Sequence, residues 1–389
     1  MSTTDHTLEL TEAIAAALEK VSANLATFAD VYPHDHTTRN VYPIREAWND
    51  LPAGSNVGWT TGFWPGMLWL AYQLSNADEY RQAGMLQAKR FAQRLMDKLD
   101  LDHHDIGFLY TLASVAPWRL TGDDDARVTG IQAADQLLTR YIERPGILQA
   151  WGRMDDPQQR GRTIVDSLMN LPLLYWAGKM TGQPHYTQAA LRHASQLRDY
   201  LVRPDGSTFH TFYFNPETGA PISGATDQGA ADASCWSRGQ AWAIYGFVLS
   251  YAYAQDDSFL QAACRVADYF LAHLPADGIA YWDLIFTDGS TEERDSSAAS
   301  IAVCGLLELA ARLPPSADAQ RYHAAARHIL ASLFHNYSTV HHPASNALLL
   351  HGVYSKPHGK GVDEGNLWGD YFYLEALMRL ARPDWKPYW

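Results

Sequence analysis

The sequence predicts an all-α fold in which six helical hairpins close into a ring, an (α/α)6 barrel, and three observations favour this prediction. The first is a recurring pattern of an apolar helix, a short polar turn and an amphipathic helix. The turns lie within residues 69–84, 118–130, 175–190, 251–263 and 310–326. The second is that the leading helix of each pair is the more apolar one, which is typical of inner helices covered by outer helices.

The third observation concerns the last predicted helix, residues 366–381. It is as aromatic as any internal helix, whereas an open solenoid needs polar caps at both ends. We therefore expect a closed barrel that spans residues 1–389 as a single domain. Strand signals are weak and are confined to connecting segments such as 207–219 and 279–290.

Composition limits the classes of function. The chain has 389 residues, of which 47% are hydrophobic, so it can bury a large core. Its 43 acidic and 30 basic residues give a net charge of -13 without a basic stripe, so nucleic acid is not an expected partner. No apolar stretch approaches the roughly 18 residues of a membrane span, and no secretory signal is visible, so we expect no membrane partner.

The cysteine and histidine patterns do not indicate a metal site. Three sparse cysteines without metal-ligand spacing fit a reducing cytoplasm. The His34–Asp35–His36 triplet is interpreted as an ordinary loop, because no partner set stands at ligand spacing. We expect neither a metal nor a cofactor, and the sequence does not indicate an oligomeric state.

The segments that lead into the six predicted inner helices stand out. In chain order they are residues 57–69, 102–110, 151–170, 234–246, 294–302 and 363–373, and all are rich in Trp, Gly, Asp and Arg. In a closed barrel these segments surround one mouth of the central cavity. Aromatic rings with a few polar groups suit a sugar, whose C–H faces stack on rings while oriented side chains bind the hydroxyls.

Seven motifs occur in these regions in a fixed order: WTTGFWPGMLWL, HHDIGF, GRTIVDSLMNLPLLYWA, TFHTF, WSRGQAWAIYG, RDSSAASIA and GDYFYLEAL. Together, from about residue 57 to 377, they resemble glycoside hydrolase family 88, the unsaturated glucuronyl hydrolases. The resemblance implies an (α/α)6 barrel and a cytoplasmic enzyme. It also implies, as substrates, the short oligosaccharides left by polysaccharide lyases, which carry a 4,5-unsaturated uronic acid at the non-reducing end.

The reaction implied by the resemblance is hydration of a vinyl ether. Protonation of C4 places positive charge on C5 and the ring oxygen, water adds at C5, and the resulting hemiketal opens and expels the remaining sugar. This chemistry needs a proton donor that also activates water. By the resemblance that group is Asp166, which lies near the start of the predicted apolar helix 162–182.

A helix start lowers the pKa of a carboxyl group, which opposes a donor role. We therefore expect a second carboxylate nearby that raises the pKa of Asp166, and Asp105 is the candidate. Either aspartate could instead cap its own helix. His104, beside Asp105, is expected to contact the sugar or the carboxylate, unless it is structural.

The resemblance also suggests residues that bind substrate. Arg238, together with Gln240, is expected to contribute polarity at the substrate, or to be a structural cation stacked between tryptophans. His210 and Gln228 align by their order with positions for the uronate and the reacting water. The expected stacking platforms are Trp59, Trp151 and Trp242.

The segment 351–365 holds Ser355, Lys356, His358 and Lys360 among glycines, which is the densest group of potential cations in the acidic chain. We expect this segment to lie at the mouth and to bind a negatively charged group, such as a sulfate, on the sugar next to the uronate. The alternative is a solvated surface loop.

Three rival functions stay open at this stage. One is the related unsaturated rhamnogalacturonyl hydrolase, which acts on pectin fragments with the same barrel and chemistry. Another is a sugar epimerase or isomerase, which would use His104 and His210 as facing bases. The third is a sugar-binding barrel without catalysis, which would need neither Asp105 nor Asp166. The sequence does not indicate the linkage, the second sugar or its sulfation.

Overall fold

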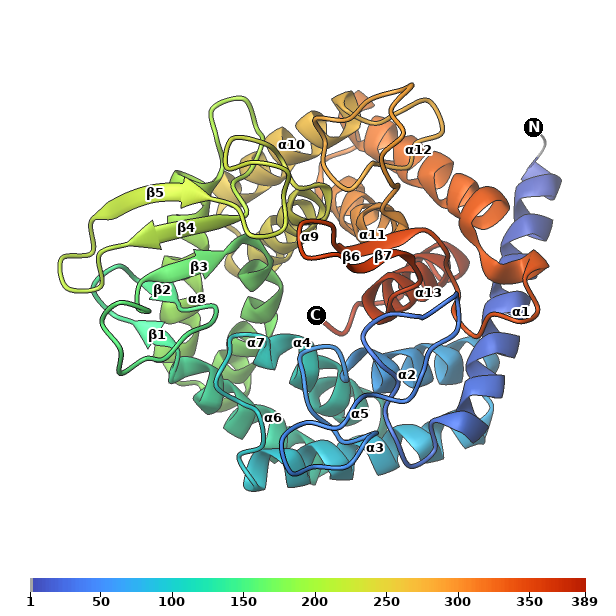
Figure 1. Ribbon diagram of the computed structural model, residues 1–389, viewed down its shortest axis with the longest axis horizontal. Helices are drawn as coiled ribbons and strands as arrows, with labels where there is room; N and C mark the ends of the chain where they lie inside the picture. The colour runs from blue at the N-terminus through green and yellow to red at the C-terminus, as the bar shows by residue number, and fades with distance from the viewer. Residues whose placement is uncertain (1–2) are drawn as a thin grey trace.

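The computed structural model describes residues 3–389, with side chains from residue 10 onward. Six inner helical segments form a ring, and six outer helices surround it (Figure 1). The inner segments are α2 (Phe63–Ser75), α4 to α5 (Ile106–Tyr110, Ala116–Thr121), α7 (Leu171–Thr181), α9 (Ser237–Ala254), α11 (Ser296–Arg312) and α13 (Leu367–Ala381). The outer helices are α1 (Thr3–Thr27), α3 (Asp78–Met96), α6 (Asp124–Leu138), α8 (Pro184–Gln196), α10 (Asp257–Ala272) and α12 (Ala317–Ser332).

Both ends of the chain close the ring. The last inner helix, α13, packs against the first, α2, and α1 contacts both of them (Figure 1). The N-terminal helix therefore serves as the sixth outer helix, the partner of α13. This arrangement confirms the (α/α)6 barrel predicted from the sequence.

The predicted difference between inner and outer helices is present. In α9 every residue from Ser237 to Ser250 is buried, whereas α10 buries one face. Aromatic residues in the first two turns of four outer helices anchor them to the inner ring, and their exposed fractions are 4% or less. They are Tyr80, Tyr186, Phe259 and Tyr322.

Glycines allow three inner segments to approach closely around Asp166. A Cβ atom on Gly107 of α4 would lie 2.3 Å from the Cα atom of Asn170, and one on Gly246 of α9 would lie 2.3 Å from the Cβ atom of Leu168. Both contacts fall on η2 (Val165–Asn170), a 3-10 turn that precedes α7. Since any side chain at these glycines would push η2 away, they fix its position between α4 and α9.

The sequence prediction of one helix over 162–182 is wrong at its start. Residues Arg162–Ile164 form strand β3, and η2 follows it, so the α-helix begins only at Leu171. Strand β3 pairs with β4 (Thr211–Phe214), and Pro172 occupies the first turn of α7, where proline favours a helix start.

The remaining strands are few. β5 (Pro221–Ala225) continues the antiparallel sheet in the order β3-β4-β5, and β6 (Gly352–Ser355) pairs with β7 (Lys360–Glu364) in a hairpin. A two-residue pair, β1 (Tyr141–Ile142) and β2 (Ile147–Leu148), completes the set among the described residues.

The strand signal over 207–219 is confirmed by β4, but the signal over 279–290 is wrong. That segment makes only isolated bridges within the described chain, because its backbone pairs with separate segments, as in the Leu284 N–H to the Cys235 carbonyl and the Trp282 N–H to the Glu293 carbonyl. Side chains add further hydrogen bonds. The carboxylate of Asp283, for example, accepts from the backbone N–H groups of Cys235 and Ile285, and Arg294 donates to the carbonyl of Ile279.

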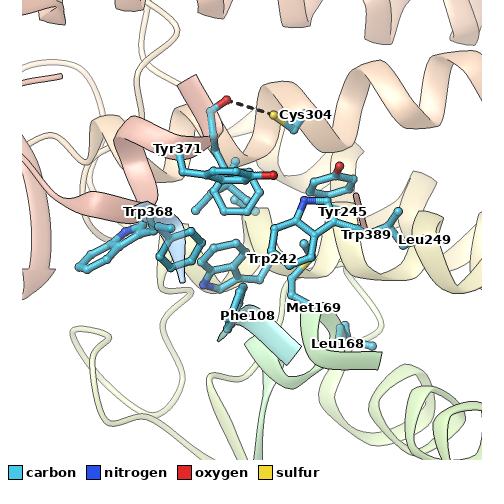
Figure 2. Packing of buried hydrophobic residues seen from close by; sticks show 14 of the residues in the cluster. Phe108, Leu168, Met169, Trp242, Tyr245, Leu249, Cys304, Trp368, Tyr371 and Trp389 are labelled. Carbon is cyan, nitrogen blue, oxygen red and sulfur yellow. Dashed lines mark hydrogen bonds between the residues drawn. The ribbon is translucent and has the colours of Figure 1, made fainter. Parts of the chain in front are cut away.

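The C-terminal segment closes the end of the barrel at which the inner helices terminate. The Tyr388 hydroxyl donates to Gln73 at 2.6 Å, near the end of α2, and the Trp389 indole donates to Glu375 at 2.8 Å. Figure 2 shows Trp389 within the aromatic cluster that contains Phe108 and Trp242. Among the described residues, the C-terminal segment thus covers the end of the barrel opposite the starts of the inner helices. No helix among the described residues is long and apolar enough to cross a membrane.

Candidate active site

Asp105 and Asp166 lie at the starts of neighbouring inner segments. Asp105 occupies the N-cap position of α4, and Asp166 lies in η2 ahead of α7. The backbone N–H of Phe108 donates to Asn170 Oδ1 at 2.9 Å and joins the two starts. Within the described chain, the Asp105 carboxylate makes no capping hydrogen bond to α4, so helix capping does not explain its position.

The two carboxyl groups share one small space. One oxygen of Asp105, one oxygen of Asp166 and a ring nitrogen of His104 all lie within 4.8 Å of one another. Burial, and then the negative charge of Asp105, raise the pKa of Asp166 well above its usual range, although Arg238 opposes this. Its Oδ1 is buried without a hydrogen-bond partner among the described residues. Of the two carboxyl groups, Asp166 is therefore the one whose protonated form the protein favours.

Asp105 shifts in the opposite direction. Burial favours its neutral form, but His104, His103 and the Asn170 side chain outweigh burial and lower the pKa of Asp105. His104 Nε2 lies 3.3 Å from one Asp105 oxygen, and His103 Nδ1 lies 3.4 Å from the other. Within the pair, the surroundings of Asp105 thus favour its ionised form and those of Asp166 favour its protonated form, which is the division expected of two coupled carboxyl groups.

Two buried histidines beside the pair are neutral. Burial lowers the pKa of His104 to about 4 and, with the charge of Arg238, lowers the pKa of His210 to about 3. His210 Nδ1 accepts from the backbone N–H of Asp227 at 2.9 Å, which leaves the ring proton on Nε2. His210 Nε2 and His104 Nδ1 are both buried without a partner in the described part of the chain. Each is thus free to meet a substrate group.

Arg238 is fully engaged by the protein. Its Nη1 atom donates to Asp295 Oδ2 at 3.1 Å and to the carbonyl of Val353, and its Nη2 atom donates to the Tyr354 carbonyl at 2.6 Å and to Gln228 Oε1 at 2.7 Å. The side chain is 1% exposed. Arg238 therefore holds Gln228 and the β6–β7 hairpin in place, which corresponds to the structural alternative weighed for it from the sequence.

Two residues proposed from the sequence face the core instead of the mouth. Trp242 is 1% exposed and packs 5.2 Å from Phe108 between ring centroids (Figure 2), so neither of its faces is open to a sugar. Gln240 donates to the carbonyl oxygens of Gly206 and Val266 at 2.8 and 2.9 Å. The inner-helix position that made both residues candidates also buries them.

The other two tryptophans remain at the mouth. Trp59 is half-buried, lies 5.1 Å from Trp368 between ring centroids and donates its indole N–H to the Tyr354 hydroxyl at 2.9 Å. Trp151 is also half-buried, and the Arg162 guanidinium lies 5.7 Å from the centroid of its ring. Both keep exposed ring surface, as a sugar platform requires.

The segment 351–365 is not a loop but the β6–β7 hairpin, which lies over the centre of the ring in Figure 1. Ser355 is buried and its hydroxyl lies 2.7 Å from His358 Nδ1. Lys360 Nζ lies 3.2 Å from Asp35 Oδ2 and 3.9 Å from the ring centroid of Tyr354. Lys356 forms an ion pair with Glu293.

Comparison with known proteins identifies the family. The model of Glycosyl Hydrolase Family 88 matches residues 26–378. The chain belongs to this family. It is 44% identical over 382 residues to the unsaturated chondroitin disaccharide hydrolase of Streptococcus pneumoniae (strain ATCC BAA-255 / R6), an alignment that covers 98% of this chain and 94% of the relative.

Solved structures agree. The crystal structure of unsaturated glucuronyl hydrolase from Streptococcus agalactiae superposes with a TM-score of 0.93 at 44% identity, covering 98% of this chain and 94% of that one. An aspartate-to-asparagine mutant of that enzyme in complex with dGlcA-GalNAc6S gives a TM-score of 0.85 at 42% identity, covering 98% and 93% of the two chains. Family 88 membership thus accounts for the barrel and for the order of the seven motifs.

Sequence reasoning missed three residues that support this family 88 site. Asp295 is buried, caps α11 through Ser297 and pairs with Arg238. Tyr354 links the hairpin to Trp59. Asp35 pairs with Arg45 at 2.9 Å and with Lys360, and it comes from the His34–Asp35–His36 triplet. For the two aspartates, the only signal in the sequence was an isolated acidic residue among polar ones. Such a residue does not indicate which cation it pairs with in the fold.

The cluster of His104, Asp105 and Asp166 also has the spacing of a metal-ligand set, with one donor atom from each residue within 4.8 Å. Metal ligation needs both carboxyl groups ionised. Here burial and Asp105 favour the protonated form of Asp166. Without a cation, the arrangement therefore suits a proton held on Asp166, and the family chemistry requires such a proton.

Proposed function

We propose that this protein releases the 4,5-unsaturated uronic acid from the non-reducing end of lyase-generated oligosaccharides of the glycosaminoglycan type. The observation that carries the proposal is the close pair of buried carboxyl groups at an aromatic barrel mouth, in which the surroundings raise the pKa of Asp166 and lower that of Asp105. The named activity of the S. pneumoniae relative and the dGlcA-GalNAc6S bound to the S. agalactiae mutant support the same substrate class.

The reaction proceeds by hydration of the double bond. Asp166 gives its proton to C4, and positive charge develops on C5 and the ring oxygen. The ionised Asp105, one oxygen of which lies within 4.8 Å of an Asp166 oxygen, stabilises that positive charge and orients the ring hydroxyls. The Asp166 carboxylate then takes a proton from the water that adds at C5, and the hemiketal opens to release the second sugar. No nucleophile attacks the anomeric carbon, so the rule that links carboxyl spacing to stereochemistry does not apply.

Neighbouring side chains position the substrate. The free Nε2–H of His210 donates to the uronate or to the reacting water, and Gln228, held by Arg238, directly follows Asp227, whose backbone N–H donates to His210. Trp59 and Trp151 supply the faces on which the two sugars stack. Lys360, with Ser355, meets an anionic group such as a sulfate on the second sugar.

A panel of unsaturated disaccharides tests the proposal. It would include chondroitin, hyaluronan and heparin types, sulfated and not, together with a rhamnogalacturonan disaccharide, and would follow loss of the absorbance of the conjugated double bond. We expect turnover of at least one glycosaminoglycan disaccharide at well above the rate for the rhamnogalacturonan one. The reverse preference would assign the protein to pectin degradation instead.

The cellular setting follows from the substrate. We propose a cytoplasmic enzyme with residues 1–389 as one catalytic domain, acting after lyases have produced short fragments. The three cysteines, Cys235, Cys264 and Cys304, are free, which fits a reducing compartment.

A further inference from the structure

The two lysines of the β6–β7 hairpin differ in the charge that surrounds them. Lys356, in the turn, pairs with Glu293 and also lies 3.7 Å from the carboxylate of Glu292. Lys360 pairs with a single carboxylate of the described chain, Asp35, which Arg45 also neutralises. Within these contacts, the Lys356 group has one more negative than positive charge, and the Lys360 group has one more positive than negative charge.

The two glutamates beside Lys356, Glu292 and Glu293, are held in place at the mouth. Glu292 and Glu293 belong to the connection between α10 and α11, where the Trp282 indole donates to Glu292 at 2.8 Å and the Trp282 backbone N–H donates to the Glu293 carbonyl at 3.0 Å. Trp282 is 5% exposed, and its carbonyl accepts from the N–H of Ser237, beside Arg238. The two carboxylates therefore form a built part of the rim.

We propose that Glu292 and Glu293 are specificity-determining residues that hold Lys356 back from the substrate. This inference rests on the proposed function and refines its substrate class. A sulfate on the second sugar is accepted where it faces Lys360. It is refused where it faces Lys356, because that lysine would have to leave two carboxylates that would then repel the anion.

The substitution Glu293→Gln tests this directly. It removes the carboxylate closer to Lys356. Among the sulfated disaccharides, the isomer that the wild type turns over most slowly is taken as the one whose sulfate faces Lys356. The ratio of kcat/KM for this isomer to kcat/KM for the unsulfated disaccharide should rise by about 10-fold. Glu292→Gln, which acts from a longer distance, should produce a smaller rise in the same direction. Circular dichroism and the melting temperature confirm that both variants fold.

Two further variants separate the role of Lys356 from a general effect of charge. Adding Lys356→Ala to Glu293→Gln should abolish the gain. Asp363→Asn makes the same charge change on the same hairpin but contacts His351 instead of Lys356, so it should leave the ratio unchanged.

Each variant has an outcome that would contradict the role of Glu292 and Glu293. An unchanged ratio in Glu293→Gln, a gain that survives Lys356→Ala, or an equal gain in Asp363→Asn would overturn the inference while leaving the proposed function intact. A wild-type protein that turned over none of the unsaturated disaccharides would overturn the proposed function, and this inference with it.

Discussion

The carboxyl groups of Asp105 and Asp166 approach within 4.8 Å of one another beside the ring of His104. Burial raises the pKa of Asp166, and the nearby charge of Asp105 adds to the rise, while the histidines lower the pKa of Asp105. The two shifts have opposite signs, so the site favours a protonated carboxyl group on Asp166 beside an ionised one on Asp105. Hydration of an unsaturated uronate needs these two groups.

Replacing Asp166 with Asn should lower kcat/KM by at least about 10²-fold, because Asn can neither donate the proton nor activate water. The melting temperature should equal or exceed that of the wild type, since the substitution removes an ionisable group that burial disfavours. Turnover and thermal unfolding of the purified variant are the measurements. A folded variant with near-normal turnover would exclude the catalytic role.

Replacing Asp105 with Asn should move the basic limb of the pH profile. Activity falls as pH rises through the pKa at which Asp166 loses its proton, and Asp105 is one cause of that raised pKa. Without the Asp105 charge, the limb should shift to lower pH by about one to two units, with a large loss of rate. A profile of kcat/KM against pH measures it, and an unshifted limb would mean that the two carboxyl groups are not coupled.

Lys360→Ala should discriminate between substrates. Loss of this cation should lower kcat/KM for a sulfated disaccharide by about 10-fold and leave the unsulfated one within about two-fold, since a lost charge contact is worth about 1 to 3 kcal/mol. Lys356→Ala should have a smaller effect, because Glu293 already engages that lysine. Equal losses of kcat/KM on both substrates would mean that the hairpin is a solvated surface element that does not recognise the sulfate.

Asp370 should make stability depend on pH. Burial raises its pKa to about 7, although Tyr42 and the backbone N–H groups of Leu348 and Leu349 donate to it. Because the folded pKa lies above the unfolded value of about 3.9, the contribution to stability is complete below about pH 4 and is lost as pH rises through 7. At about 1.4 kcal/mol per unit, the loss amounts to about 4 kcal/mol.

The variant Asp370→Asn isolates this effect. Between about pH 5 and about pH 9 the wild type should lose stability relative to the variant, which cannot ionise at this position. Chemical denaturation at each pH gives the two free energies of unfolding. Parallel curves for the two proteins would show that Asp370 is already ionised in the folded state over this range, so that folding does not raise its pKa.

The barrel could be predicted from the sequence because the hydrophobic pattern of its helices repeats along the chain. The difference between α9 and α10 follows from side-chain hydrophobicity alone, and the aromatic α13 indicated closure. The strand β3 ahead of Asp166 was not accessible, since it forms only by pairing with β4 about 50 residues later. Local propensity cannot report such a partner.

The site was accessible only in part, for a similar reason. Asp105 and Asp166 could be placed at neighbouring helix starts, and the resemblance gave them roles. Whether Arg238 faces substrate depends on four acceptors, the most distant in sequence being the Tyr354 carbonyl, 116 residues away. The burial of Trp242 depends equally on distant partners such as Phe372. Contacts across the barrel decide these orientations, and no local pattern encodes them.

The most direct test of the central claim is a time course of the wild-type enzyme on an unsaturated chondroitin disaccharide in D2O. Release of the second sugar and loss of the double-bond absorbance are followed together, and the product is examined by NMR. The account predicts that both signals change at one rate and that C4 of the product carries one deuteron in a single configuration, delivered by Asp166. Release of the second sugar while the absorbance persists would contradict it, because the bond would then have been cleaved without hydration.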